Sequence, residues 1–292
     1  MNLFNIRDIE NLTGIKAHTL RIWEKRYSII MPPTQPGKHR QYDNNDLRHI
    51  LRISSLYHSG IKISKIADMS IEEINSFTFS VDKKTNFEVF ITQLIDYSVE
   101  MNEVSFKKLY SELLETMGEE NLYTLIIFPF LMRVGNLWLT GHVVPMQEHF
   151  ASNIIRNELI SSIDRLSGSD KNNQLKVILF CPIGEYHELP LLYLQYILKK
   201  NKVRTFFLGV NTNEDIVAQC MDKIGASTLM LYMMTNFTSF DAESYIQGLA
   251  DRFPDKKIVC GGPAFKGITS PASNIDLMKD FPSLINKCKD LF

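Results

Sequence analysis

Residues 176–200, KVILFCPIGEYHELPLLYLQYILKK, decide the fold of the C-terminal part of the chain. Residues 176–180 are an apolar run of strand length, and residues 191–200 have the pattern of a helix with a basic end. His187 therefore lies on the loop or first turn where a strand gives way to a helix. Because ligands bind at this carboxyl end of the strands in an open α/β sheet, His187 is a candidate ligand-binding residue.

The residues after this stretch continue the same alternation. Short apolar strands (VRTFFLG, STLMLYM and KKIVCGG) alternate with helical segments up to the C-terminus. This alternation predicts a parallel sheet with crossover helices, a Rossmann-like domain over residues 174–292. The polar linker SGSDKNNQ precedes the domain, and residues 86–166 before it are almost wholly helical, which predicts a four-helix bundle.

Residues 1–75 have a third pattern. Apolar positions at helical spacing are broken at Thr13-Gly14, the layout of a helix-turn-helix, and Trp23 falls on the apolar side. The following run SIIMPPTQPGKHRQY is rich in proline and predicts a hairpin-like loop or wing. The predicted fold class is therefore multidomain α and α/β: a winged helix-turn-helix, a helical bundle and a Rossmann-like parallel sheet.

Composition and charge narrow the classes of function. The chain has 292 residues, 45% of them hydrophobic, and a net charge of −1, yet residues 1–65 carry 11 Lys and Arg against 5 Asp and Glu, a net of +6. A basic head on a near-neutral chain suggests a nucleic-acid partner, but a solvated basic face would carry the same charge, and charge alone does not separate the two. We see no secretory signal and no apolar run near the ~20 residues of a membrane helix, so we expect a cytoplasmic protein. The four cysteines are scattered without a CxxC pair, which argues against a zinc finger or a disulfide framework.

The second predicted helix and the wing carry side chains that can contact bases and phosphates. These candidate DNA-binding residues are Thr19, Arg21, Lys25, Arg26, Tyr27, Lys38, His39, Arg40 and Tyr42. The run Leu20–Glu24 (LRIWE) and the later Arg40-Gln41-Tyr42 resemble the MerR-type regulators over about the first 70 residues. The resemblance implies a winged helix-turn-helix that binds a double-stranded DNA operator as a dimer. For the whole chain we expect a homo-oligomer, a dimer or a tetramer. The usual MerR-type chain continues into a long coiled coil, and this one does not.

The C-terminal part carries a second resemblance. A carboxylate two residues before an imidazole can accept its Nδ1–H and leave Nε2 to bind a metal, although a lone exposed histidine is otherwise most often an ordinary surface residue. Glu185-x-His187-x-x-Pro190, Ser227-x-Leu229 and Gly261-Gly262 resemble the cobalamin-binding domain of methionine synthase and its relatives. The resemblance implies that His187 is the lower cobalt ligand. It also implies that the cofactor lies against Glu185, Ser227, Leu229, Gly261 and Gly262. Pro190 departs from the family's glycine and restricts the backbone where the cofactor's tail would pass.

The bundle adds a third resemblance. Trp138 is followed ten and eleven residues later by Glu148 and His149. This spacing is similar to the Trp-x9-Glu-His pattern of the B12-dependent photoreceptor regulators of the CarH and LitR type. It implies that these three side chains contact the upper face of adenosylcobalamin or another cobalamin. Leu139 stands where light-sensing members often have a histidine.

Together these patterns predict a transcriptional regulator, a repressor rather than an enzyme, that senses adenosylcobalamin. Light, through photolysis of the cobalt–carbon bond, and ligand-controlled oligomerisation are further expectations from the resemblance. Two alternatives remain open. Pro190 and Leu139 favour a regulator whose cobalamin fold serves protein contacts without a cofactor. A corrinoid carrier for a methyltransferase or mutase is disfavoured by the DNA-binding head.

Overall fold

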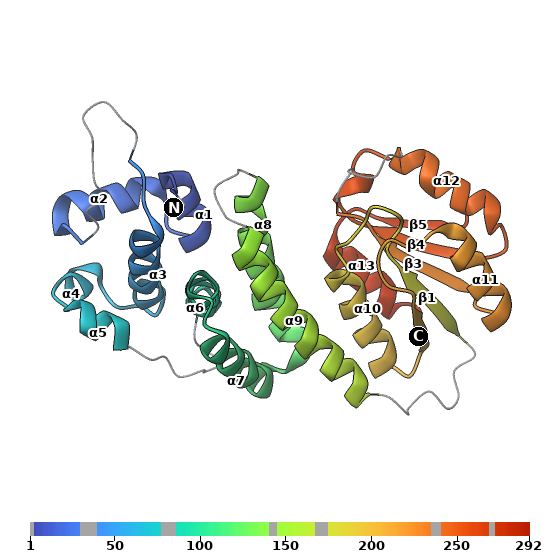
Figure 1. The fold of residues 1–292 in the computed structure, drawn as a ribbon, viewed down its shortest axis with the longest axis horizontal. Helices are drawn as coiled ribbons and strands as arrows, with labels where there is room; N and C mark the ends of the chain where they lie inside the picture. The colour runs from blue at the N-terminus through green and yellow to red at the C-terminus, as the bar shows by residue number, and fades with distance from the viewer. Residues whose placement is uncertain are drawn as a thin grey trace. The chain divides into compact units, whose positions relative to one another are not determined.

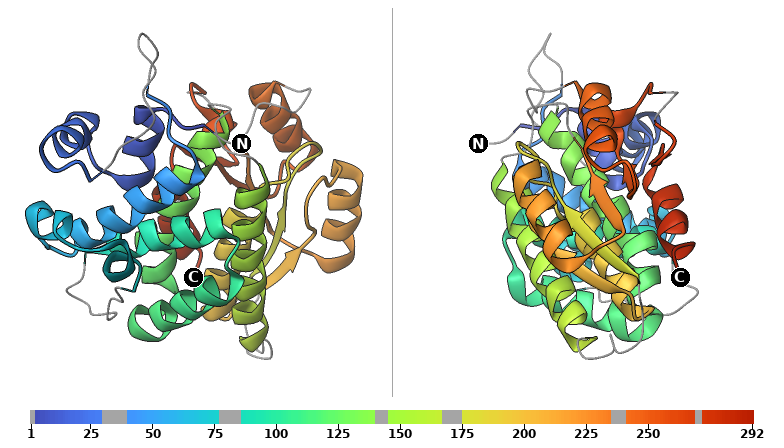
Figure 2. Two further views of the ribbon diagram at one scale, coloured as in Figure 1. Left: turned by 60° about the vertical axis from the view of Figure 1, so that its left-hand side comes forward. Right: turned by 90° about the vertical axis from the view of Figure 1, so that its right-hand side faces the viewer.

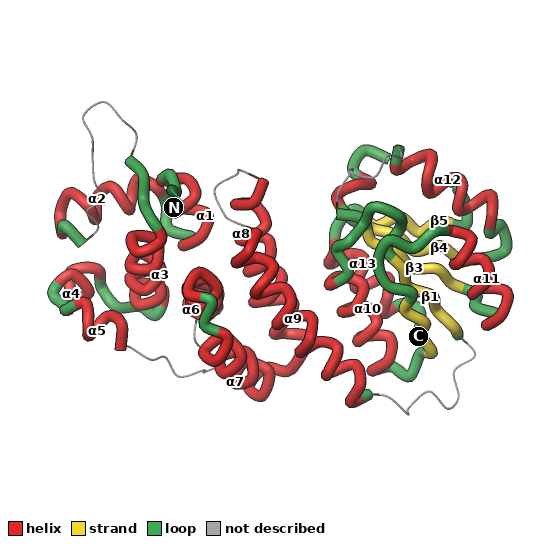
Figure 3. The backbone as a smooth tube through the Cα atoms, in the orientation of Figure 1, coloured by secondary structure: helices red, strands yellow, loops and turns green. Residues whose placement is uncertain are grey.

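The computed structural model describes residues 3–29, 40–76, 86–139, 145–166, 175–234, 241–268 and 272–292. The chain forms two compact units, Met1–Ile154 and Ile155–Phe292 (Figure 1). Among the described residues, the strands of the first unit are limited to one isolated bridge, and the second unit contains a sheet (Figure 3). None of the helices in the described ranges is long and apolar enough to cross a membrane.

The first unit begins with a helix-turn-helix. Its helices are α1 Ile6–Thr13, α2 Ala17–Tyr27, α3 Asn44–His58, α4 Ile63–Ala67 and α5 Ile71–Ser76. The Asn5 side chain accepts from the backbone N–H groups of Arg7 and Asp8, and the Asp8 carboxylate accepts from the N–H of Asn5, a capping box that begins α1. Gly14, at φ 72°, ends α1 and turns the chain into α2. The predicted helix-turn-helix is confirmed.

The apolar side of α2 is part of the core of this domain. Leu20 and Trp23 are 1% and 3% exposed, and the Trp23 ring meets Tyr57 of α3 edge-on with centroids 4.9 Å apart. The prediction that Trp23 belongs to the core is confirmed. Because the buried positions share one side of the helix, the remaining side of α2 is left to solvent.

Residues 86–139 and 145–166 hold four α-helices. They are α6 Phe87–Glu100, α7 Glu103–Leu122, α8 Phe128–Leu139 and α9 Pro145–Arg165. A turn of π-helix, Tyr123–Ile127, joins α7 to α8, and Gly118 kinks α7. The bundle has a dense apolar core of side chains with no exposed surface, including Phe90, Leu94, Phe106, Leu113 and Phe130. The predicted four-helix bundle is confirmed.

The helix-turn-helix and most of the bundle belong to one compact unit because α3 lies against α6. The Ser55 and Thr92 hydroxyls are 2.7 Å apart in this contact, and Arg52 Nε donates to Asp96 Oδ2 at 2.9 Å. The predicted boundary between the two domains falls on residues 77–85, outside the described residues. The predicted boundary after residue 166 likewise falls on residues 167–174, which are not described either.

The second unit is a doubly wound parallel sheet. Its elements are β1 Lys176–Phe180, α10 Leu189–Lys200, β2 Arg204–Phe207, α11 Glu214–Ile224, β3 Thr228–Tyr232, α12 Ala242–Arg252, β4 Lys257–Gly261, β5 Ile275–Met278 and α13 Phe281–Lys289. The strand order of the described residues is β2-β1-β3-β4-β5, and every pair is parallel. The predicted Rossmann-like domain is confirmed.

Helices cover both faces of this sheet (Figures 1 and 2). On one face Ile178, Leu229 and Ile258 form a continuous apolar cluster with residues of α11 and α12. The helices α10 and α13 contact each other and lie on the other face. From β1 the chain passes to β2 on one side, and from β2 it crosses back to β3 on the other side of β1. This reversal makes the carboxyl end of β1 the topological switch point.

Candidate functional site

A buried carboxylate organises the loop after β1. Glu185 has no exposed surface, and its Oε1 accepts from His187 Nδ1 at 2.6 Å and from the backbone N–H groups of His187 and Tyr186 at 2.8 and 2.9 Å. Its Oε2 accepts from the backbone N–H of Met234 at 2.7 Å. The carboxylate therefore holds its own loop and ties it to the residues that follow β3.

These hydrogen bonds decide the charge of Glu185 and the tautomer of His187. Burial raises the pKa of Glu185, but the hydrogen bonds from the His187 ring, the His187 N–H and the Met234 N–H outweigh it, so that the pKa lies below its ordinary value. The charged carboxylate keeps the proton on Nδ1, which places the lone pair of the imidazole on Nε2. The His187 side chain is 47% exposed. This arrangement can present Nε2 to a metal.

Three loops meet around this dyad. The N–H of Asn211, after β2, donates to the carbonyl of Glu185 at 3.2 Å, and the Asn211 side chain accepts from the N–H of Gly184 at 3.0 Å. Met234 adds the loop after β3. The dyad therefore lies at the topological switch point of the sheet, the position predicted for His187.

Pro190 lies in the first turn of α10, directly after this loop. Proline is accommodated there because the first N–H groups of a helix have no partner inside it and the fixed φ of the ring suits a helix. Glu188, two residues before Pro190, is the N-cap and forms an ion pair with Arg156 of α9. The departure from the family's glycine is thus compatible with the observed backbone.

Two of the predicted cofactor contacts lie elsewhere. Ser227 precedes β3, at its amino end, where its N–H donates to the carbonyl of Lys176 at 3.3 Å. Five residues of strand separate it from Tyr232, roughly 16 Å. Leu229 has no exposed surface and belongs to the apolar cluster under α11 and α12. The prediction for Ser227 and Leu229 is wrong, because parallel strands place their amino ends on the edge opposite His187.

The glycine pair at the end of β4 is closely packed against neighbouring parts of the chain. Gly262 has φ 125°, and a Cβ there would lie 2.2 Å from the carbonyl oxygen of Met233. A Cβ on Gly261 would meet Leu284 at 3.1 Å. A side chain at either position would therefore collide with the chain itself. The residue of this region that does contact the dyad is Met234, through its N–H to Glu185 Oε2, and the sequence patterns did not single it out.

The candidate upper contacts lie on the bundle. Trp138 is in α8, but its side chain is outside the described residues. Glu148 and His149 occupy the first turn of α9, with Glu148 Oε2 2.8 Å from His149 Nδ1. The neighbouring Gln147 was not predicted; it is 6% exposed, and its Oε1 is buried without a hydrogen-bond partner among the described residues.

Three of the five residues of α2 predicted to contact DNA lie on its solvent side. Arg21, Lys25 and Arg26 are exposed, whereas Thr19 and Tyr27 are half-buried. His18 and Ile22 are also exposed on this helix, although neither was predicted. Lys38 and His39 lie outside the described residues.

Tyr42 is not an exposed wing residue. It is 1% exposed, and its hydroxyl donates to Glu24 Oε1 at 2.6 Å. Burial, together with the Glu24 charge, raises the pKa of Tyr42 above its ordinary value. Arg40 is 44% exposed and forms an ion pair with Glu24 at 3.1 Å. The prediction that Tyr42 reaches DNA is wrong, because its ring fills the core beside the Phe4–Tyr42 bridge.

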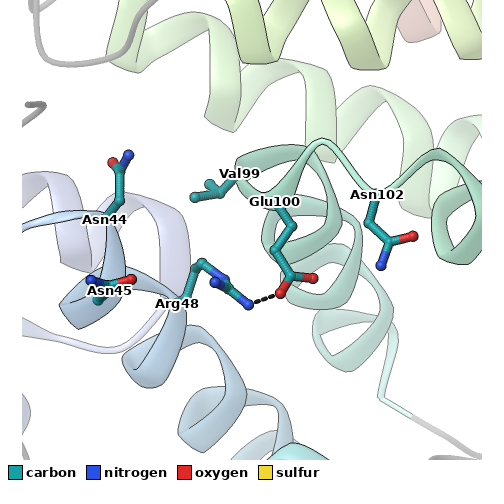
Figure 4. Close-up of a pocket in the computed structure, with 6 residues that line it drawn as sticks. All are labelled: Asn44, Asn45, Arg48, Val99, Glu100 and Asn102. Atoms are coloured by element: carbon teal, nitrogen blue, oxygen red, sulfur yellow. Dashed lines mark ion pairs between the residues drawn. The ribbon is translucent and has the colours of Figure 1, made fainter.

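A pocket of about 560 Å³ lies between α3 and α6 (Figure 4). Its lining is polar apart from Val99; the other lining residues are Asn44, Asn45, Arg48, Glu100 and Asn102. Arg48 and Glu100 form an ion pair in it. It is in the first unit, so it does not involve the Glu185–His187 dyad. Across the described ranges, no cluster of three or more His, Cys, Asp or Glu side chains could hold a metal ion by itself.

Two family models match the chain. Residues 4–71 match the MerR HTH family regulatory protein model, and residues 91–159 match the B12 binding domain model. The first match spans the helix-turn-helix and its following helices, and the second spans most of the bundle.

Individual proteins extend these matches. The HTH-type transcriptional repressor CarH of Myxococcus xanthus is 23% identical over 238 residues, 77% of this chain and 79% of CarH. The HTH-type transcriptional repressor CarA of the same organism is 28% identical over 210 residues, 71% of this chain and 68% of CarA. The monomethylamine corrinoid protein of Methanosarcina barkeri has a similar fold, with a TM-score of 0.55 at 16% identity over 68% of this chain and 97% of that protein.

Proposed function

The chain combines a MerR-type helix-turn-helix with a B12-binding domain and is homologous to the CarH and CarA repressors, and we propose that it represses transcription in response to adenosylcobalamin. The observation that carries this proposal is the Glu185–His187 dyad at the switch point of the sheet. His187 Nε2 is the proposed lower ligand of cobalt. Glu185 orients the ring and keeps the proton on Nδ1.

Cobalamin bound there would supply a cobalt ion that accepts the imidazole nitrogen and, in its adenosyl form, a light-sensitive cobalt–carbon bond. The proposed upper contacts are Trp138, Glu148 and His149. A carboxylate and an imidazole can hydrogen-bond ribose hydroxyls or adenine, and an indole ring can shield the bond from water. The buried Gln147 amide lies next to Glu148 and His149 in sequence, and we propose it as a further polar contact of the ligand.

The exposed side of α2 is the proposed DNA-reading surface. Arg21, Lys25 and Arg26 supply the cationic donors that base edges and phosphates accept. Arg40 on the wing has its charge shared with Glu24, so we propose it as a positioning contact to phosphate rather than a base reader. We propose that the repressor binds its operator as a homo-oligomer. Cobalamin can shift this equilibrium only through a difference in affinity for the two states.

The test is the visible spectrum of the protein, incubated with adenosylcobalamin in darkness and then illuminated. We expect a bound corrinoid whose absorption depends on His187 and changes on illumination. His187→Ala should lose the histidine-dependent band, whereas His18→Ala, on the DNA-binding side of α2, should keep it. A His187→Ala protein with an unaltered spectrum and affinity would refute the ligand assignment.

A second candidate function is a regulator whose sheet domain contacts proteins without a cofactor. The close packing of Gly262 on Met233 favours it, because that packing accounts for the glycine without a bound cofactor. This reading predicts a colourless protein that nevertheless binds operator DNA, which the same experiment detects.

A further inference from the structure

The turn of the helix-turn-helix is held by a residue of the bundle. Arg133 of α8 donates through Nη1 to the carbonyl of Leu12 at 3.5 Å. Its Nη2 donates to both carboxylate oxygens of Glu88, at 2.8 and 2.6 Å. The two side chains are 20% and 32% exposed, so water only partly screens the pair. The carbonyl of Leu12 belongs to the last turn of α1, where carbonyls have no partner within the helix.

The same pair touches the turn itself. A Cβ on Gly14 would lie 3.0 Å from Glu88 Oε2 and 3.6 Å from Arg133 Nη2, so the turn backbone lies directly on the two side chains. On its other side, the Thr13 carbonyl accepts from His58 Nε2 at 2.7 Å. The turn is thus fixed between α3 and the Arg133–Glu88 pair.

The start of α2 is tied to α1. The N–H of Ala17 donates to Glu10 Oε2 at 3.1 Å, and Lys16 forms an ion pair with Glu10 at 3.0 Å. The N–H of Ile15 donates to the Thr13 hydroxyl at 3.2 Å. Because these bonds join the end of α1 to the beginning of α2, a displacement of the turn also displaces the helix proposed to read DNA.

We propose that Arg133 is a positioning residue that couples the state of α8 to the orientation of α2. Trp138, a proposed upper contact of cobalamin, follows Arg133 by five residues on the same helix. A shift or rotation of α8 on ligand binding moves the guanidinium group, and with it the contacts to Leu12 and Glu88. The inference rests on the proposed function, because it needs a cobalamin-dependent change in operator affinity to exist.

Assembly of several copies is the competing explanation of such a change. Two helix-turn-helix domains in one assembly gain operator affinity through effective concentration alone, without any change inside the protomer. On that explanation Arg133 is irrelevant. The experiment therefore has to measure assembly and operator affinity separately on the same samples.

The test uses the full-length protein, adenosylcobalamin and an operator selected from random DNA by the wild-type protein. Arg133→Met removes the charge and the donors at similar volume, and Glu88→Gln removes the charge of the partner. Arg165→Met is the matched control, because Arg165 donates only to the Ser161 and Ser162 hydroxyls in the hydrogen bonds seen for it. Absorbance titration gives cobalamin affinity, sedimentation gives assembly, and DNA titration gives operator affinity with and without cobalamin.

For the wild type and Arg165→Met we expect operator affinities that differ roughly 5- to 150-fold between the two states, the usual range of allosteric coupling. For Arg133→Met we expect that ratio to fall below about threefold, with cobalamin affinity and assembly unchanged. A wild-type ratio in Arg133→Met overturns the inference. If Arg133→Met binds operator in neither state, Glu88→Gln decides: a reduced ratio supports the inference, and a wild-type ratio overturns it. Failure of the proposed function is separately visible, because the wild type would then bind no cobalamin.

Discussion

Arg156 of α9 forms an ion pair with Glu188, the residue that follows His187 and caps α10. Glu188 is the more buried partner, with 15% of its side chain exposed against 41% for Arg156. The pair anchors the loop at the point where the chain turns from the dyad into the helix. The residue that directly follows His187 is therefore bound by a side chain 32 positions earlier in the sequence, Arg156.

Removing this anchor should weaken cobalamin binding. We expect Arg156→Met and Glu188→Gln each to raise the dissociation constant for cobalamin about 10-fold, the lower end of what partners of a metal-binding histidine contribute. Because the two residues act through one pair, the double variant should lose little more than either single variant. Absorbance titration measures all three.

The control is Arg252→Met, which removes an exposed ion pair with Asp215 on α11. Its cobalamin affinity should equal that of the wild type. Additive losses in the double variant would contradict an interaction between Arg156 and Glu188.

Tyr42→Phe should affect stability and not operator affinity. The substitution deletes the hydroxyl that donates to the nearly buried Glu24, which costs about 1–2 kcal/mol of unfolding free energy. Chemical denaturation measures the loss. Tyr27→Phe, on the half-exposed side of α2, should show the reverse: little change in stability and weaker operator binding. A Tyr42→Phe protein of normal stability and weakened binding would restore Tyr42 as a DNA contact.

Gly262→Ala should destabilise the second unit strongly. At φ 125° an alanine is strained by about 1–3 kcal/mol. In addition, its Cβ would have to displace the Met233 backbone. Gly248→Ala, inside α12 with open space around it, should instead stabilise by about 0.5–1 kcal/mol. Thermal unfolding of both variants measures this difference in stability. Equal stabilities of the two variants would show that Gly262 does not pack against Met233 in solution.

Asp276 predicts a pH-dependent contribution to stability. Burial raises its pKa, but the hydrogen bonds from Lys287 and Lys257 outweigh burial and lower the pKa below its ordinary value. A carboxylate with a lowered pKa stabilises the fold above its unfolded-state pKa, and the stabilisation is lost as the pH falls through the folded-state value. Asp276→Asn should therefore cost up to about 1 kcal/mol near neutral pH and nothing at strongly acidic pH. Chemical denaturation at a series of pH values measures this, with Asp255→Asn, at an exposed position, as the control. A difference in unfolding free energy between the wild type and Asp276→Asn that persisted in acid would contradict the prediction.

The local sequence pattern was sufficient to predict the helices and strands and one part of the candidate site, the Glu185–His187 bond. The periodicity of residues 176–200 predicted a strand, a loop and a helix, and a spacing of two residues predicted the bond between Glu185 and His187. Both succeed because the contacts involved are local, so the spacing along the chain determines the spacing in the structure.

The remaining features depend on contacts that no local pattern shows. Ser227 matched a motif by type, but only the strand order shows on which edge of the sheet it lies. Tyr42 looked like a wing residue because its neighbours are basic, yet its ring is buried against residues far away in sequence. The contact between Arg133 and Leu12 spans 121 residues.

A substitution of Gly14 would disturb the contact between the turn of the helix-turn-helix and the Arg133–Glu88 pair of the bundle. Any larger residue there adopts a left-handed conformation at a cost of about 1–2 kcal/mol, and its Cβ acts as a wedge against the Glu88 carboxylate. The added Cβ would press on the Glu88 carboxylate that Arg133 binds, and the atoms nearest to it include none of the side chains proposed to read DNA. A genetic selection for variants that still bind the operator but no longer respond to cobalamin should therefore recover substitutions at the Gly14 codon.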